Sequence, residues 1–223
     1  MTFVSILLPT IRPDLFRLRM NEYARLDVPW PFEVVTVSDR EDLDVTPTHP
    51  LMTVKHRVQP RMGNVPATNL AFEVCEGRYV IATNDEVEFD SQILMALVRA
   101  GEAQGEDALL SSTQTPYCSN DYYGVFFANC PFGRRSFFQK LNGADVLFDP
   151  VYRCFYADPD LALRAHAIGL TVQMVPDAIN THRTVHGADG HMSNAQAYYG
   201  QDHATFVNRW AHLGPFPGDP STR

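Results

Sequence analysis

Short apolar runs alternate with amphipathic segments along the first half of the chain. Four runs have the length and the aliphatic, β-branched composition of buried strands, namely residues 3–8, 32–37, 51–54 and 79–83. Residues 13–26 and 64–76 lie between these runs, and the second segment has apolar side chains at helical spacing and ends at Gly77. This alternation predicts an α/β fold with a mostly parallel central sheet covered on both faces.

The second half of the chain has a less regular pattern. It predicts helices over residues 93–103, 134–141, 158–169 and 194–213, and strands over residues 109–113, 122–128 and 171–175. The third of these helices has strong end signals, because Asp158 precedes Pro159 and Gly169 closes the segment. We expect one domain over residues 1–213, followed by a flexible tail over the Pro- and Gly-rich residues 214–223.

Polar side chains follow several of the predicted strands: Thr10, Arg12, Asp39, Asn84, Asp85 and Glu86. Ligands of parallel sheets bind at the carboxyl ends of strands, so we expect these side chains to converge on one site. The stretch from Asn84 to Glu88 concentrates carboxylates, which repel one another unless a cation joins them, and oxygen ligands favour Mg²⁺ or Mn²⁺. The alternative is a solvated loop that caps the next helix through Asp90 or Ser91.

Composition narrows the function classes. The formal net charge of −8 argues against broad electrostatic binding to nucleic acid or anionic lipid. The apolar runs are too short to span a bilayer. The four cysteines form no Cys-x-x-Cys pair, which favours reduced thiols in a cytoplasmic protein and argues against zinc. The sequence also lacks both Gly-x-Gly-x-x-Gly after the first strand and a P-loop, so a bound diphosphate would depend on a carboxylate-held metal.

Seven motifs in order resemble family 2 glycosyltransferases over roughly residues 3–210. They comprise residues 4–10, 32–39, 63–69, 84–86, 147–164, 175–182 and 202–210. Four positions depart from the family pattern: Asn84 and Glu86 replace acidic residues of the Asp-x-Asp metal motif, Thr68 replaces a frequent Arg, and Ala157 replaces the Glu of a Glu-Asp pair.

The resemblance implies a GT-A fold, a Rossmann-like three-layer sandwich with a mixed sheet. It implies a nucleotide-sugar-binding half over residues 1–90 and an acceptor-binding half over residues 91–213. It assigns the donor, a UDP- or dTDP-linked sugar, to Thr10, Arg12, Asp39, Asn69, Asn84 and Asp85. It assigns a Mn²⁺ or Mg²⁺ ion to Asp85, Glu86 and His182, with His186 as the alternative histidine.

Asp158 matches the family's general base for an inverting transfer to the hydroxyl of a glycan or other acceptor. Its local sequence alone favours a helix cap, and the two roles are compatible. At a helix N-terminus we expect its ionised form to be favoured. Two other classes stay open: a sugar-phosphate nucleotidyltransferase, and a non-catalytic domain that binds a nucleotide sugar or glycan. A nucleic-acid acceptor is also open, although the acidic charge disfavours it.

Overall fold

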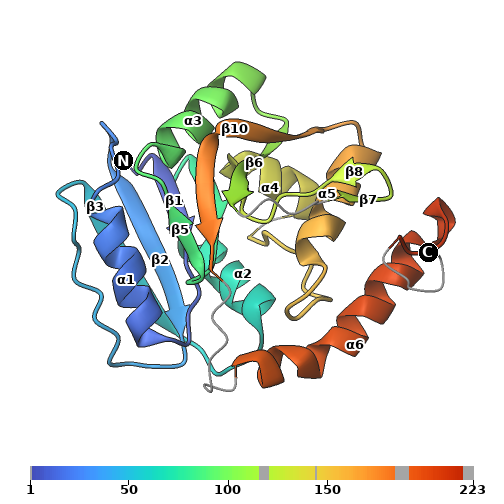
Figure 1. Ribbon diagram of the computed structural model, residues 1–223, viewed down its shortest axis with the longest axis horizontal. Helices are drawn as coiled ribbons and strands as arrows, with labels where there is room; N and C mark the ends of the chain where they lie inside the picture. The colour runs from blue at the N-terminus through green and yellow to red at the C-terminus, as the bar shows by residue number, and fades with distance from the viewer. Residues whose placement is uncertain (1, 116–120, 144, 184–190, 218–223) are drawn as a thin grey trace.

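The computed structural model describes residues 2–115, 121–143, 145–183 and 191–217 (Figure 1). Its centre is a sheet of eight strands in the order β3-β2-β1-β4-β9-β6-β10-β5. In that order the strands are Met52–Val58, Phe32–Ser38, Val4–Leu7, Tyr79–Ala82, Pro131–Arg134, Ala108–Thr115, Thr171–His182 and Val87–Phe89. Four neighbouring pairs are parallel, whereas β9 runs antiparallel to β4 and β6, and β5 runs antiparallel to β10. The predicted mixed, mostly parallel sheet is confirmed.

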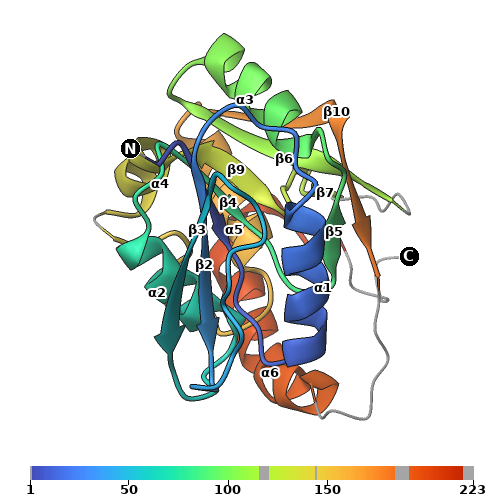
Figure 2. The same ribbon diagram turned by 90° about the vertical axis from the view of Figure 1, so that its left-hand side faces the viewer.

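Helices cover both faces of this sheet (Figures 1 and 2). Helices α1 (Pro13–Tyr23) and α3 (Ile93–Gln104) share one core with Val4 and Ile6 of β1. Helices α2 (Asn64–Val74), α4 (Arg135–Asn142) and α5 (Ala157–Ala167) share the other core with Leu7. Successive residues of β1 therefore point to opposite faces and are all buried, which explains why all of them except Ser5 are apolar. The predicted three-layer sandwich is confirmed.

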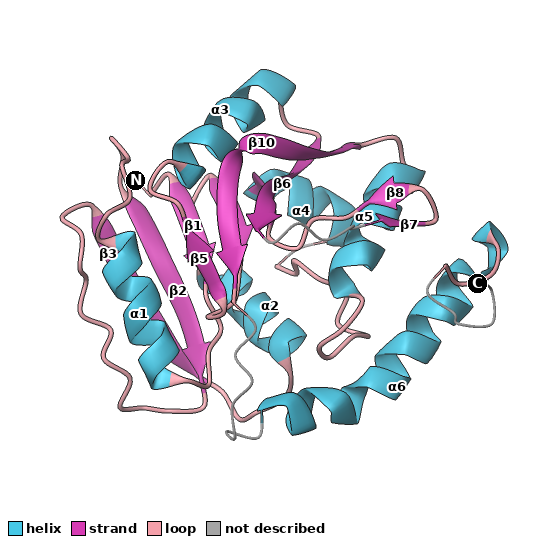
Figure 3. Cartoon of the chain, in the orientation of Figure 1, coloured by secondary structure: helices cyan, strands magenta, loops and turns pink. Residues whose placement is uncertain are grey.

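One sequence prediction for the middle of the chain is wrong, and one strand was not predicted. The strand expected over residues 122–128 is a hairpin of β7 (Asp121–Tyr122) and β8 (Val125–Phe126) outside the central sheet (Figure 3). Tyr123 and Gly124 both have positive φ, 55° and 75°, and this left-handed backbone turns the chain where a strand would have to continue. Strand β9 was not expected, because it is only four residues long and contains Pro131 and Gly133.

Strand β10 is longer than its sequence suggests. Pro176 indicated an end at Val175, but an irregularity between Val175 and Ile179 carries the strand past the proline to His182. The last residues of β10 pair with β5, and His182 lies opposite Val87. The extension brings His182 to the acidic segment that follows β4.

Helix α6 spans His191–Trp210 and is followed by a short 3₁₀ turn over Ala211–Leu213. Its side chains hold the loop that precedes α5 in place. Fully buried Asp202 accepts hydrogen bonds from the backbone N–H groups of Arg153, Cys154 and Phe155 at 2.8–3.2 Å. Beyond the 3₁₀ turn, the ring of Phe216 packs on Tyr122 with 5.4 Å between ring centroids, so this part of the expected tail contacts the domain. Every helix in the described part of the chain is too short or too polar to cross a membrane.

Candidate nucleotide-sugar site

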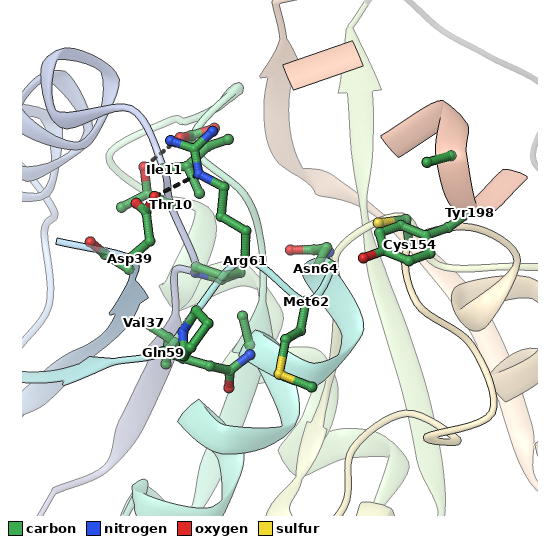
Figure 4. A pocket seen from close by; sticks show the side chains of 17 residues that line it. Thr10, Ile11, Val37, Asp39, Gln59, Arg61, Met62, Asn64, Cys154 and Tyr198 are labelled. Atoms are coloured by element: carbon green, nitrogen blue, oxygen red, sulfur yellow. Dashed lines mark hydrogen bonds and ion pairs between the residues drawn. The ribbon is translucent and has the colours of Figure 1, made fainter. Parts of the chain in front are cut away.

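A pocket of about 240 Å³ opens at the carboxyl ends of β1 and β2 (Figure 4). Thr10, Asp39 and Asp85 line it together, although they follow three different strands. Parallel pairing of β1 with β2 and β4 puts these strand ends side by side, as expected from the sequence. Further lining residues come from the loop before α2, from the start of α2 and from α6, among them Gln59, Arg61, Met62, Asn64 and Tyr198.

Asp39 has one engaged and one unengaged carboxylate oxygen. Its Oδ2 accepts a hydrogen bond from Nε of Arg61 at 2.6 Å, and Figure 4 shows the two side chains facing each other in the pocket. Its Oδ1 is buried and has no hydrogen-bond partner among the described residues. A buried acceptor of this kind is costly unless it is satisfied, so Asp39 keeps one unsatisfied acceptor oxygen beside the pocket.

Arg12 joins the two carboxylates of the predicted metal motif. Its Nε donates to Oδ2 of Asp85 at 3.2 Å, a terminal nitrogen donates to Oδ1 of the same residue, and the other donates to Oε1 of Glu86 at 2.6 Å. Thr10 also donates to Oδ2 of Asp85 at 2.5 Å. Burial lowers the pKa of Arg12, but the hydrogen bonds and charges of its two partners outweigh burial and raise it.

The rest of the acidic segment is divided between other partners. Nε2 of His182 lies 3.6 Å from Oε2 of Glu86, so the predicted histidine is beside the predicted carboxylate. Asn84 does not face this group: its side-chain oxygen accepts the backbone N–H of Glu86 at 2.9 Å and shapes the turn. Glu88 forms ion pairs with Arg19 and Arg183 instead. The alternative ligand at position 186 lies outside the described residues.

The predicted metal ligands do not fit a divalent ion as they are arranged. Both oxygens of Asp85 and one of Glu86 already accept hydrogen bonds from Arg12. Within the described ranges, no group of three His, Cys, Asp or Glu side chains is placed to hold a metal. The crowded carboxylates are therefore neutralised here by a guanidinium, and the mutual repulsion inferred from the sequence is relieved by a side chain of the protein.

Asn69 is engaged away from the pocket. Its side-chain oxygen accepts the backbone N–H groups of Leu147 and Phe148, and its nitrogen donates to the carbonyl of Phe148 at 2.9 Å. These bonds tie α2 to the chain segment before α5. The predicted contact between Asn69 and a nucleotide stays a prediction.

Asp158 is not the cap of α5, which corrects the sequence interpretation. The helix begins at Ala157, and the capping residue is Tyr156, whose φ of 63° lies in the left-handed region. Asp158 follows in the first turn, where burial raises its pKa to about 7 despite a backbone hydrogen bond that lowers it. The expected stabilisation of its ionised form by the helix terminus is thus smaller than the cost of desolvation.

Aromatic side chains gather beside Asp158. Tyr122, whose pKa is raised by burial and then by the charge of Asp158, stacks on Phe127 and contacts Phe206. Tyr156 stacks on Phe206, with 5.1 Å between ring centroids. The sequence does not predict this cluster as a whole, because its members come from the hairpin and from Phe127 after it, from the cap of α5, from α6 and from the segment at Phe216. No local pattern connects those segments.

Comparison with known proteins identifies the fold. No protein-family model and no curated protein sequence matches this chain. Among solved structures, a mannosyltransferase from Pyrobaculum calidifontis in complex with GDP-Man and Mn²⁺ is similar, with 19% identity over 92% of this chain and a TM-score of 0.65. S. aureus TarS 1–349 in complex with UDP-GlcNAc is similar, with 15% identity over 95% of this chain and a TM-score of 0.67. The chain has the GT-A fold.

The match covers unequal shares of those proteins. This chain spans 64% of the mannosyltransferase chain and 73% of the TarS 1–349 chain. At these identities the likeness establishes the fold alone, which is the mixed α/β sandwich expected from the sequence.

Proposed function

We propose that this protein is a glycosyltransferase that moves a sugar from a nucleoside diphosphate to an acceptor hydroxyl. The observation that carries the proposal is the meeting of Thr10, Asp39 and Asp85 in one pocket at the carboxyl edge of a GT-A sheet. The mannosyltransferase and TarS structures of this fold contain GDP-Man and UDP-GlcNAc, respectively. In this proposal residues 1–90 bind the donor and residues 91–213 bind the acceptor.

The base of the nucleotide is assigned to the Asp39 side of the pocket. The unengaged Oδ1 of Asp39 accepts an imide N–H, and both uracil and thymine carry one. This supports a UDP- or dTDP-linked donor. Arg61, which is held by Asp39 and is about half exposed, supplies a positive charge beside the same pocket.

The departing diphosphate accumulates negative charge that a cation must offset. When bound, Mn²⁺ or Mg²⁺ would supply that charge, and Asp85, Glu86 and His182 are the residues from which its site would be assembled. Because Arg12 holds the two carboxylates, the described arrangement does not fit an ion. The proposal also includes the predicted roles of Asn84 and Asn69 in binding the nucleotide sugar.

Asp158 is the proposed general base. A carboxylate with a pKa of about 7 is ionised often enough at neutral pH to accept the proton of the acceptor hydroxyl, and it is a stronger base than an ordinary Asp. A single displacement of this kind inverts the anomeric configuration. The neighbouring aromatic cluster offers flat, apolar faces on which an acceptor sugar ring can stack.

A non-catalytic nucleotide-sugar-binding domain is the second candidate, favoured by the pairing of Asp85 with Arg12. Incubation with a panel of nucleotide sugars, with and without Mn²⁺, separates the two. Slow release of free sugar together with nucleoside diphosphate supports the transferase. Saturable nucleotide binding without any release supports the binding domain, and the absence of nucleotide binding contradicts both.

A further inference from the structure

Arg12 has the position between Asp85 and Glu86 that a divalent ion would have to take. The three side chains are 9%, 4% and 14% exposed, so their interactions are weakly screened by water. The guanidinium forms a fork on Asp85 and a third hydrogen bond to Glu86. An ion that coordinates these two residues must displace hydrogen bonds of the charge-assisted kind, which are roughly twice as strong as neutral ones.

The backbone around Arg12 supports this arrangement. Its own N–H donates to Oγ1 of Thr10 at 3.0 Å, and that hydroxyl donates to Asp85. Arg12 is also the capping residue of α1, since its carbonyl accepts the N–H of Phe16 at 3.0 Å. The start of α1 thus fixes the base of the Arg12 side chain, while the guanidinium itself is held, among the described residues, only by the two carboxylates.

We propose that Arg12 is a competitor of divalent cations that is built into the site. Its guanidinium neutralises Asp85 and Glu86 in the free protein, so that Mn²⁺ alone binds weakly. A guanidinium has five N–H donors, and three hydrogen bonds leave two without partners among the described residues. These two can bind an anion. That the anion is the donor diphosphate, and that it draws Arg12 off the carboxylates, rests on the function proposed above.

Removal of the Arg12 side chain separates two roles, competition with a divalent cation and a purely structural ion pair, because the two roles predict different affinities for Mn²⁺. If Arg12 competes, Arg12→Met frees both carboxylates for Mn²⁺, with Glu86 beside His182. If the ion pair only holds the fold, its loss leaves the carboxylates displaced or protonated, and the affinity for Mn²⁺ does not rise.

The test is a titration of the purified protein with Mn²⁺ in the absence of nucleotide. The concentration of unbound Mn²⁺ is measured at each step by electron paramagnetic resonance. We expect Arg12→Met to bind Mn²⁺ at least about tenfold more tightly than the wild type. Arg19→Met is the matched control, because Arg19 is buried and pairs with two carboxylates, Glu22 and Glu88. An equal gain in Arg19→Met would contradict the proposal, as would an unchanged affinity in Arg12→Met.

Two further measurements cover the case in which Arg12→Met does not fold. Arg12→Lys keeps the charge but cannot fork across both carboxylates, so its Mn²⁺ affinity should lie above that of the wild type. Wild-type protein that binds Mn²⁺ alone with a Kd of about 1 μM or below overturns the proposal without any variant. A parallel titration with UDP separates the two ideas: absent UDP binding contradicts the proposed function and leaves the Mn²⁺ comparison between variants intact.

Discussion

The indole N–H of Trp210 donates a hydrogen bond to the buried carboxylate of Asp160, 3.1 Å away. This bond joins the end of α6 to the first turn of α5. The same carboxylate accepts bonds from the Tyr152 hydroxyl, from Arg164 and from Arg209. Asp160 lies two residues after Asp158, so the network that holds Asp160 also sets the position of the proposed base.

Removal of the Asp160 carboxylate should therefore be strongly destabilising. Asp160→Ala leaves Arg164 and Arg209 without their shared buried partner, and losses of this kind typically cost about 3–5 kcal/mol of unfolding free energy. Trp210→Phe removes one hydrogen bond to the same carboxylate and should cost about 1–2 kcal/mol. Urea denaturation of both variants measures the difference. If Asp160→Ala were as stable as the wild type, the network would contribute little to stability.

The activity should depend on pH through Asp158. The base must be ionised, so kcat/KM should rise with pH and level off above its pKa of about 7. A profile measured between pH 5 and 9 checks this expectation. A plateau already reached at pH 5 would mean that an ordinary carboxylate, or no carboxylate, takes the proton.

The same pKa shift has a consequence for stability with a definite sign. The folded-state pKa of Asp158 lies above the unfolded value, so the folded protein binds more protons, and this residue lowers stability as pH rises from about 4 to about 7. Asp158→Asn removes that penalty. Its melting temperature should exceed that of the wild type at pH 8, and the gain should disappear at pH 4. A gain of the same size at both pH values would contradict the assignment.

Activity of Asp158→Asn should move in the opposite direction. Loss of a general base typically lowers turnover by about 10²-fold or more, while binding of UDP should be nearly unchanged because Asp158 does not line the nucleotide pocket. Chromatographic quantification of the transferred sugar measures turnover, and calorimetry measures the affinity for UDP. Turnover near the wild-type rate, or a product with retained anomeric configuration, would exclude Asp158 as base in a single displacement.

Asp39→Ala should weaken UDP binding without weakening the fold. A hydrogen bond to a charged group contributes about 1.5–3 kcal/mol, which corresponds to roughly a 10- to 100-fold increase in Kd. The partner Arg61 is about half exposed and remains hydrated when Asp39 is gone. Asp42→Ala is the control, because Asp42 also pairs with an arginine but lies exposed outside the pocket. If Asp39→Ala binds UDP as tightly as the wild type but has a much lower free energy of unfolding, Asp39 has a structural role instead.

The sequence predicts those parts of the molecule that depend on local pattern. Strands β1, β2 and β4 are predictable because both their faces are buried, which makes most of their residues apolar. The meeting of Thr10, Asp39 and Asp85 is predictable because all three follow strands that end at one edge. Strands β5 and β9 are three and four residues long and have no periodicity to detect.

Other features of the site depend on contacts between distant segments. The pairing of Arg12 with Asp85 joins residues 73 positions apart. No local sequence signal shows whether these two side chains pair with each other or contact a bound nucleotide sugar separately. The cap at Tyr156 requires a left-handed backbone in a non-glycine residue, which tertiary packing imposes against local preference. The raised pKa of Asp158 depends on burial, which the sequence around Pro159 does not reveal.

Strand β9 joins two otherwise separate parallel blocks. It pairs with β4 through Tyr79, Val80 and Ile81 on one side, and with β6 through Leu110 and Ser111 on the other. The block on the β4 side presents the pocket that Thr10, Asp39 and Asp85 line, and the block on the β6 side ends in β10, which contacts α5. The twist between the two blocks therefore depends on the single strand β9. An added Cβ at Gly133 would lie 3.1 Å from the carbonyl of Ala108, the first residue of β6, so that even a Gly133→Ala change presses directly on the junction between the two blocks.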